Sequence, residues 1–367
     1  MFASATLIQL LFFVFIFRKL SFAKEVEDKV YGSDIRFTEP VSIIICAKNE
    51  AANLRENLPY ILKQNYKTFE VVLINDASSD ETLEVMEEFA SRHRNIKIVD
   101  VASNETFWGN KKYALTLGIK VATSDYLLFT DADCKPNSEN WVAQMANCFT
   151  SQKSIVLGYS PYKQVKNSFL NILIRFETLL TGLQYLSYAR AGIPYMGVGR
   201  NLAYHKKEFF NAKGFVNHIK LLSGDDDLFV NQVANKANSV VCIAPGSFIT
   251  SNPKRSFSEW FRQKRRHVST ASYYKLIHRI LLGFYFITKI LFWISLFILL
   301  FQSYKLVVTI SIAVFLLIVK LIFYRKAFSR LGDTSLWWST PLLEIFLITF
   351  QFAIFIANRI SKPKHWK

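Results

Sequence analysis

The sequence predicts an α/β domain with a mostly parallel sheet and flanking helices, joined to helices long enough to lie in a membrane. Two observations support this prediction. Between residues 40 and 136, short apolar runs alternate with segments of helical periodicity, the pattern of a parallel sheet. After residue 278 the chain becomes almost continuously apolar, and 51% of its 367 residues are hydrophobic. The remaining length is sufficient for one α/β domain with its own core.

The first element is an uncharged apolar run, Phe2 to Phe17, just short of the usual length of a membrane span. A secretory signal peptide carries basic residues before its apolar run, whereas here they begin after it, at Arg18. We therefore expect a membrane anchor over residues 1–22, with the following chain on the cytoplasmic side of a plasma or inner membrane. Cleavage after the small residues of Ser21–Ala23 is the alternative.

Strands and helices then alternate. In order, we expect a strand in VSIIICAKNE (41–50), a helix at Ala51–Leu62, a strand at Val71–Ile74, a helix after NDASSD, a strand at Ile96–Val99, a helix at Lys111–Thr123 and a strand at Tyr126–Phe129. Because parallel strands end at the same edge of a sheet, the polar residues that follow them are expected to gather there.

The acids of NDASSD have different expected roles. Asp80, like Ser79, stands where a side chain caps the next helix. Asp76 lies just beyond the strand and is too early to cap that helix. We interpret it as a ligand-binding residue, since open α/β sheets bind ligands at this edge.

The segment TDADCKP (130–136) places two carboxylates, Asp131 and Asp133, two residues apart after the fourth strand. Such hard oxygen ligands suit Mg²⁺ or Mn²⁺ shared with the phosphates of a nucleotide, although a solvated strand end is the simpler alternative. Neither a dinucleotide-binding nor a P-loop glycine motif occurs at these turns. Lys111 and Lys112 are placed to neutralise phosphate instead, although lysines at a helix start are often only solvated.

Together these motifs resemble the inverting glycosyltransferases of family 2, which have the GT-A fold. The resemblance rests on the first strand with its NE, on NDASSD, on the lysine before ALTLG and on TDAD, and it covers about residues 40–270. It implies a nucleotide-sugar donor and a divalent cation, Mg²⁺ or Mn²⁺. By resemblance, Asp76 contacts the base and ribose, Asp131 the ribose, and Asp131 with Asp133 the metal. Lys111 matches the lysine of the nucleotide site.

Three consecutive acids stand in SGDDDLFV (223–230), ahead of an apolar helix start. Their mutual repulsion is expected to raise the pKa of at least one carboxyl toward a value useful in a general base. The alternative is a group of acids favoured by a helix N-terminus. The resemblance places the base here. Because Gly224 stands where many members have Glu, Asp225 is the first choice and Asp226 the second.

Two more segments match the family. QKRRH (263–267) is similar to its Q-x-x-R-W motif, which implies substrate contacts for Gln263 and Arg266, whereas His267 replaces the tryptophan that helps to form the acceptor site. A basic amphipathic helix on an anionic bilayer is an equally good and compatible interpretation of this segment. The glycine-rich stretch around Gly197 and Gly199 corresponds to one that faces the acceptor; on the residues alone it is an ordinary turn.

Residues 271–367 are expected to be a C-terminal membrane region. Three runs are long enough to span a bilayer, at Ile280–Phe301, Leu306–Tyr324 and Pro341–Asn358. Lys289, Lys320 and Glu344 inside them are costly in lipid and are expected to snorkel, pair or line a path for an acceptor. With a cytoplasmic α/β domain, three spans would leave the basic tail outside, against the positive-inside tendency, so one run is expected to be re-entrant or interfacial.

The net charge of +17 lies largely beside the apolar runs, which favours attraction to acidic lipid headgroups over nucleic-acid binding. The four cysteines have no metal-binding spacing and are expected to be reduced.

The expected function is inverting transfer of a sugar from a nucleotide-diphosphate sugar to a membrane-associated, lipid acceptor. A processive polysaccharide synthase of the same family is the alternative, with a glycan acceptor. A nucleotidyltransferase is disfavoured because the chain lacks a glycine-rich phosphate loop. A non-enzymatic membrane transport or scaffold protein would leave the acid clusters idle.

Overall fold

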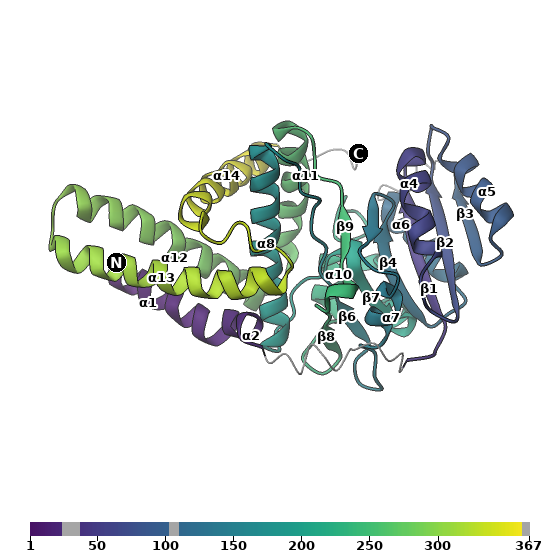
Figure 1. The fold of residues 1–367 in the computed structure, drawn as a ribbon, viewed down its shortest axis with the longest axis horizontal. Coiled ribbons are helices and arrows are strands. Elements are labelled where there is room, and N and C mark those ends of the chain that lie inside the picture. Colours follow the sequence, from purple (N-terminus) through teal and green to yellow (C-terminus); the bar gives the residue numbers. More distant parts are fainter. Residues whose placement is uncertain (24–36, 103–109, 362–367) are drawn as a thin grey trace. The chain divides into compact units, whose positions relative to one another are not determined.

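The computed structural model describes residues 1–23, 37–102 and 110–361, and the chain forms two compact units (Figure 1). The sheet unit comprises Glu25–Lys163, Pro194–Pro253 and Lys364–Lys367. The helical unit comprises Met1–Lys24, Gln164–Ile193 and Lys254–Pro363. The domain boundaries expected from the sequence, 1–22, 40–270 and 271–367, stay predictions.

Seven strands form the main sheet in the order β3-β2-β1-β4-β7-β6-β8. Strands β3, β2, β1 and β4 are parallel, whereas β7 runs antiparallel to both β4 and β6. The strands are β1 (Val41–Ala47), β2 (Phe69–Asp76), β3 (Ile96–Val101), β4 (Tyr126–Asp131), β6 (Ile155–Leu157), β7 (Leu202–His205) and β8 (Ser239–Val241). A second, two-stranded sheet pairs β5 (Cys134–Pro136) with β9 (Ile249–Ser251).

Helices flank the sheet. They are α4 (Ala51–Leu62), α5 (Thr82–Arg92), α6 (Asn110–Val121), α7 (Trp141–Ala146), α9 (Lys206–Asn211) and α10 (Asp227–Val233). All seven residues of β1 are buried, as expected for a parallel strand covered on both faces. Helix α6 packs closely on β2 at Gly118, where a Cβ atom would lie 2.2 Å from Cδ1 of Ile74. This close approach fixes the helix whose first turn carries Lys111.

The strand register brings the expected site residues to one edge. Cys46 of β1 pairs with Asp131 of β4, and Ala47 pairs with Asn75 of β2. After β1 the chain builds β2 and β3 on one side and then returns to place β4 on the other. The carboxyl ends of β1 and β4 therefore flank a topological switch point, where open α/β sheets bind ligands. Asp76 ends β2, so the prediction that it lies just beyond the strand was wrong by one position.

The helical unit contains α1 (Phe2–Phe12), a π-helical turn (Phe13–Phe17), α2 (Arg18–Ser21), α8 (Phe169–Arg190), α11 (Phe257–Thr270), α12 (Leu276–Phe301), α13 (Leu306–Arg330) and α14 (Thr340–Ile360). Within the described part of the chain, four helical segments are long and apolar enough to cross a membrane: Phe2–Ser21, α12, α13 and α14. The π-helical turn and α2 continue the first helical segment beyond the apolar run, which ends at Phe17, as far as Ser21. The tail beyond Ser361 lies outside the described residues.

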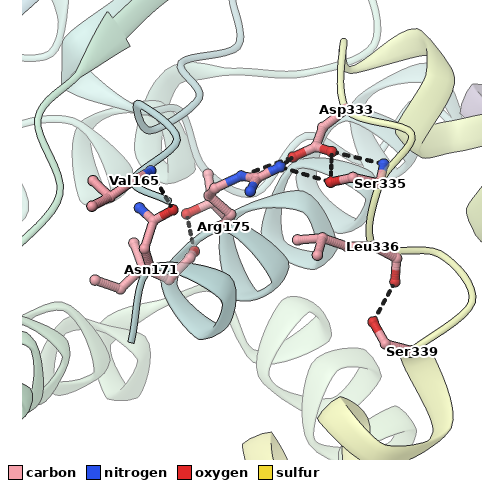
Figure 2. Close-up of polar contacts among 9 residues, drawn as sticks. Val165, Asn171, Arg175, Asp333, Ser335, Leu336 and Ser339 are labelled. Carbon is pink, nitrogen blue, oxygen red and sulfur yellow. Dashed lines mark hydrogen bonds and ion pairs between the residues drawn. The ribbon is translucent and has the colours of Figure 1, made fainter. Parts of the chain in front are cut away.

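Helix α8 was not expected from the sequence. Most of its residues are buried, and Ser168 caps it by accepting a hydrogen bond from the N–H of Asn171. On α8, Nε of Arg175 donates a 3.0 Å hydrogen bond to Asp333, in the segment between α13 and α14, and the guanidinium also reaches Ser335 (Figure 2). These contacts tie α8 to the chain that leads into α14.

Candidate active site

Lys111 lies between two of the acidic motifs. Its Nζ is 3.2 Å from Oδ1 of Asp131 and 3.1 Å from Oδ2 of Asp225. The three side chains line one pocket at the carboxyl edge of the sheet, against an apolar wall that includes Phe129 and Tyr204. The structure thus brings together the D-x-D strand, the start of α6 and the acid run, as the sequence predicted.

Three aspartates and one lysine line this pocket, and their charges shift one another's pKa values. Burial alone would favour the neutral amine of Lys111, but Asp131 and Asp225 hold its pKa above the ordinary value. Burial alone would likewise raise the pKa of Asp225, but the positive charges of Lys111 and Lys112 hold it below the ordinary value. Asp225 is therefore ionised at neutral pH.

Asp226 differs from its neighbour. Its Oδ2 accepts a 2.7 Å hydrogen bond from the N–H of Gly199, and its Oδ1 accepts one from the N–H of Asp227, at the start of α10. Burial, together with the negative charges of Asp225 and Asp227, raises the pKa of Asp226 to about 7. Both interpretations of the acid run, a helix cap and a carboxyl of raised pKa, thus apply to Asp226, which caps α10 and has a raised pKa.

Lys112 points away from these carboxylates and holds the loop before them. Its side chain is only 2% exposed, and its Nζ donates hydrogen bonds of 2.7, 3.0 and 2.7 Å to the carbonyl oxygens of His218, Leu221 and Ser223. Burial lowers the pKa of this amine to about 8. An ammonium has three N–H groups to donate, which matches the three acceptors. Nothing in the sequence pointed to this role.

The D-x-D residues end β4 and begin the following turn. Side-chain oxygens of Asp133 accept hydrogen bonds from the thiol of Cys134 and the hydroxyl of Ser251, both at 3.3 Å. Burial and the charge of Asp131 raise the pKa of Asp133. Within the described ranges, no group of three or more Cys, His, Asp or Glu is arranged to hold a metal. Two adjacent carboxylates fit Mg²⁺ or Mn²⁺ when phosphate and water complete the coordination.

Asp76 is 2% exposed, and its Oδ2 has no hydrogen-bond partner among the described residues. Burial raises its pKa, although Lys48 and Lys111 oppose the effect. A buried carboxylate oxygen without a donor is costly, so this position is suited to a donor group from a ligand. Asp80 accepts hydrogen bonds from the main-chain N–H groups of both Thr82 and Ala51, so it serves the first turns of α5 and α4.

Arg200 lies on the short helical turn Gly199–Asn201. Its positive charge is close to the D-x-D carboxylates, but no ion pair joins them among the described residues. Its guanidinium carbon is 4.3 Å from the ring centre of Tyr162, and its Nη1 is buried without a hydrogen-bond partner among the described residues. The turn itself is held by Asn201, whose side chain accepts from Nε1 of Trp141 at 3.0 Å. The sequence analysis missed Arg200, although a lone arginine inside the apolar stretch around Gly199 was a usable signal.

The two glycines do not serve an unusual backbone conformation, because neither has a positive φ. A Cβ atom on Gly197 would meet Val230 at 3.0 Å, so this glycine serves packing. A Cβ atom on Gly199 would lie 3.2 Å from Oδ2 of Asp226, so this glycine allows close approach to the carboxylate. If the segment were only an ordinary turn, these glycines would be expected to serve backbone conformation; the structure shows packing and close approach instead, and a role in acceptor binding stays a prediction.

Gln263 and Arg266 lie on α11 of the helical unit, within the basic amphipathic helix that the sequence predicted. Their expected substrate contacts stay predictions. All four cysteines, at positions 46, 134, 148 and 242, are free and buried, as expected for reduced thiols.

A parallel sheet with carboxylates and a lysine at its switch point defines an open α/β domain with a polar site at the edge where such sheets bind ligands. The family model described as Glycosyl transferase family 2 matches residues 42–212. The chain thus contains a glycosyltransferase family 2 domain, and the resemblance seen in its motifs is confirmed.

Two curated relatives illustrate the range of the similarity. The 4,4'-diaponeurosporenoate glycosyltransferase of Staphylococcus haemolyticus is 28% identical over 161 residues, which are 44% of this chain and 40% of that protein. The poly-beta-1,6-N-acetyl-D-glucosamine synthase of Staphylococcus epidermidis is 35% identical over 101 residues, 28% of this chain and 23% of that protein. The chain thus matches less than half the length of these relatives.

Among solved structures, a mannosyltransferase from Pyrobaculum calidifontis, in complex with GDP-Man and Mn²⁺, has a TM-score of 0.53 at 15% identity. The alignment covers 99% of this chain and 94% of that chain. This similarity shows the fold. The expected fold class, a GT-A domain with a mostly parallel sheet and flanking helices, is confirmed, together with helices long and apolar enough to cross a membrane.

Proposed function

We propose that the chain is an inverting glycosyltransferase that moves one sugar from a nucleotide-diphosphate sugar to a lipid acceptor in the membrane. The observation that carries the proposal is the position of Lys111, which contacts both Asp131 of the D-x-D strand and Asp225 of the acid run. These contacts place a donor-side carboxylate and a base-side carboxylate within one pocket. Direct displacement requires the carboxylate that binds the donor and the carboxylate that acts as the base to lie near the same anomeric carbon.

The donor is expected to lie along the carboxyl edge of β2 and β4. Asp76 has a buried oxygen without a donor, suited to an N–H of the base or a hydroxyl of the ribose. Lys111 and Arg200 supply positive charge for the diphosphate, Arg200 through an N–H group that has no acceptor among the described residues. The glycines at 197 and 199 then border the acceptor side, and Gln263 and Arg266 contribute further substrate contacts, as the family resemblance implies.

Asp131 and Asp133 would hold Mg²⁺ or Mn²⁺. When bound, the cation supplies positive charge that stabilises the departing nucleoside diphosphate.

Asp225 is the first choice for the general base. It is ionised at neutral pH and lines the pocket, whereas both oxygens of Asp226 accept main-chain hydrogen bonds. In the reaction, Asp225 takes the proton of an acceptor hydroxyl as its oxygen forms a bond to the anomeric carbon. The bond from that carbon to the phosphate oxygen breaks on the opposite face, and the diphosphate leaves with the electron pair. The configuration at the anomeric carbon is therefore inverted.

The apolar helices support a lipid acceptor, and so does the similarity to a protein named as a 4,4'-diaponeurosporenoate glycosyltransferase. The synthase relative keeps a processive polymerase as the alternative, with a glycan acceptor. We place the sheet unit on the cytoplasmic side of a plasma or inner membrane, because basic residues follow the first apolar helix and nucleotide-sugars are made in the cytoplasm.

The test is sugar transfer from a panel of UDP-, GDP- and dTDP-sugars by membranes that contain the protein, supplied with lipid extract. We expect one donor to be consumed with Mn²⁺ or Mg²⁺ and not with EDTA, and a product with one added sugar of inverted configuration. Products with a ladder of masses would favour the processive alternative. Retained configuration in the product would contradict the mechanism.

Matched variants separate an enzyme from a scaffold. Asp225→Asn is expected to reduce turnover by about 10²- to 10⁴-fold with donor binding retained, because only the proton acceptor is lost. Asp133→Asn is expected to weaken donor binding most. The control is Asp125→Asn, an exposed acid that directly precedes β4 at the opposite end of the strand from Asp131. Unchanged turnover in both site variants would contradict the roles proposed for these acids, and no transfer from any donor by the unaltered protein would favour the non-enzymatic alternative.

A further inference from the structure

The arrangement of the helices in the helical unit determines how far α14 extends across a bilayer. Helices α12 and α13 lie side by side as a hairpin, with only residues 302–305 between them (Figure 1). Their packing includes an apolar cluster of Phe292, Leu296 and Leu316, which also contains Phe2 of α1. When this hairpin crosses a bilayer, the start of α12 and the end of α13 lie on the same side.

The start of α14 lies within the depth of this hairpin. Glu344, in the first turns of α14, forms a 2.8 Å ion pair with Lys320 of α13, and each side chain is only 1% exposed. Lys320 precedes Arg330, the last residue of α13, by ten residues, or about 15 Å along a helix. The first turns of α14 are therefore sunk about 15 Å below the end of α13.

The segment that joins α13 to α14 is long enough to descend to that depth. It comprises residues 331–339, and nine extended residues span up to about 30 Å. Its first part is held at the end of α13 by the contact of Asp333 with Arg175 of α8 (Figure 2). The residues that follow lead to Thr340, where α14 begins.

The far end of α14 returns to the side where α12 begins. Nε of Arg265 on α11 donates to the side chain of Asn358 at 3.0 Å, and Nδ2 of Asn358 donates to the carbonyl of Arg265 at 3.0 Å. Trp260 of α11 stacks on Phe350 of α14, with ring centres 4.1 Å apart. Only residues 271–275 separate α11 from α12, so the end of α14 and the start of α12 lie on one side.

We propose that α14 does not cross the bilayer but re-enters one leaflet, so that its exposed apolar face contacts the acyl chains of that leaflet alone. This face includes Leu342, Phe352, Phe355 and Ile360, which are between 52% and 80% exposed. The C-terminus then lies on the same side as α11, and three helical segments cross the membrane. The inference is independent of the catalytic proposal, because it uses contacts of the helical unit alone.

Two arguments oppose a crossing α14. Its end contacts α11, a helix that carries Lys264, Arg265 and Arg266 in succession. If α14 crossed the bilayer, this contact would require α11 to enter the hydrocarbon, and α11 is too polar for that. A crossing α14 would also place the basic tail, which begins at Arg359, opposite the basic end of α13. Re-entry places both basic segments on one side, in agreement with the positive-inside tendency.

The test is labelling of introduced cysteines by a membrane-impermeant maleimide, before and after the membrane is opened. Three full-length variants are compared: Tyr304→Cys between α12 and α13, Thr334→Cys between α13 and α14, and Lys367→Cys at the C-terminus. The unaltered protein is the baseline, because its four cysteines are buried. We expect Lys367→Cys to behave like Thr334→Cys and opposite to Tyr304→Cys. Labelling of Lys367→Cys on the same side as Tyr304→Cys would overturn the proposal.

A second measurement avoids new cysteines altogether. Green fluorescent protein or alkaline phosphatase is fused after Lys367, and the size-exclusion profile in detergent checks that each fusion is folded. With the sheet unit in the cytoplasm, re-entry gives a fluorescent fusion without phosphatase activity. A dark fluorescent-protein fusion with an active phosphatase fusion indicates a crossing helix. Because neither readout depends on the Asp225 chemistry, failure of the proposed function leaves this test intact.

Discussion

The N–H of Gly199 donates a 2.7 Å hydrogen bond to Oδ2 of Asp226, and so ties the turn before β7 to the start of α10. The contact favours a glycine, because a Cβ atom at position 199 would lie 3.2 Å from the same oxygen and 3.4 Å from Cβ of Asp226, so the carboxylate would have to shift by a few tenths of an ångström. The position of Asp226 in the pocket wall thus depends on the absence of a side chain at position 199.

Gly199→Ala is therefore expected to displace Asp226 by a few tenths of an ångström and to reduce the turnover number by up to about 10-fold, because catalysis is sensitive to small misplacements of a site. Thermal unfolding is expected to change little. The measurement is kcat with saturating donor. Gly246→Ala is the matched control, since its Cβ atom would meet Gln144 at an ordinary 3.5 Å. Equal activity of the two variants would show that this contact does not hold the site.

Lys112 is expected to act as a positioning residue for Asp225. Lys112→Met removes three hydrogen bonds to the loop of His218, Leu221 and Ser223, each worth about 1 kcal/mol. We expect kcat to fall by about 10-fold or more while the KM for the donor stays within about 2-fold, with partial recovery in Lys112→Arg. Lys120→Met, on the exposed end of the same helix, is the control. A change in KM alone would contradict a positioning role.

Arg200 is expected to recognise the diphosphate. Arg200→Ala should weaken competitive inhibition by the nucleoside diphosphate by about 10- to 100-fold, as loss of a charged hydrogen bond of about 1.5–3 kcal/mol implies. Inhibition by the nucleoside itself should be unchanged, because the base and ribose are expected at Asp76. Arg200→Lys should recover part of the affinity. An equal loss for diphosphate and nucleoside would instead indicate that the turn had collapsed.

The pKa of Asp226 predicts how stability depends on pH. Its folded value of about 7 lies above its ordinary value of 3.8, so the folded state binds the proton more tightly than the unfolded state. The stabilising contribution is fully present below pH 3.8 and is lost as the pH rises through 7. Asp226→Asn carries no charge but loses one of two main-chain hydrogen bonds at every pH. We therefore expect its unfolding temperature, relative to that of the unaltered protein, to be higher by a few degrees at pH 8 than near pH 4. Thermal scans of both proteins in detergent at these pH values are the check, and a constant difference would contradict the shift.

The sequence was sufficient for those parts of the fold that local signals specify. Helix α4 was predicted to the residue, because its periodicity begins after a polar turn and ends cleanly at Leu62. The strands β1 to β4 were predicted because each is a short apolar run bounded by polar residues. Strands β6 and β8 have three residues each and take their pairing from distant segments, so no local pattern announces them.

In the candidate site, too, local sequence signals predicted some residues, whereas others depend on contacts between distant parts of the chain. The D-x-D pair, Lys111 and the acid run were found from motifs, because each is a local group of charged residues. The role of Lys112 was not, because its three acceptors lie more than 100 positions away along the chain. Arg200 was missed for a similar reason, since its nearness to the D-x-D carboxylates arises only when β7 inserts beside β4.

The position of Lys111 also bears on the order of events in a catalytic cycle. One ammonium group serves both Asp131 and Asp225, so an incoming diphosphate competes with Asp225 for it. An idle enzyme therefore keeps its prospective base engaged in an ion pair, and arrival of the donor is what releases it. In the proposed mechanism, such an arrangement favours binding of the donor before the acceptor.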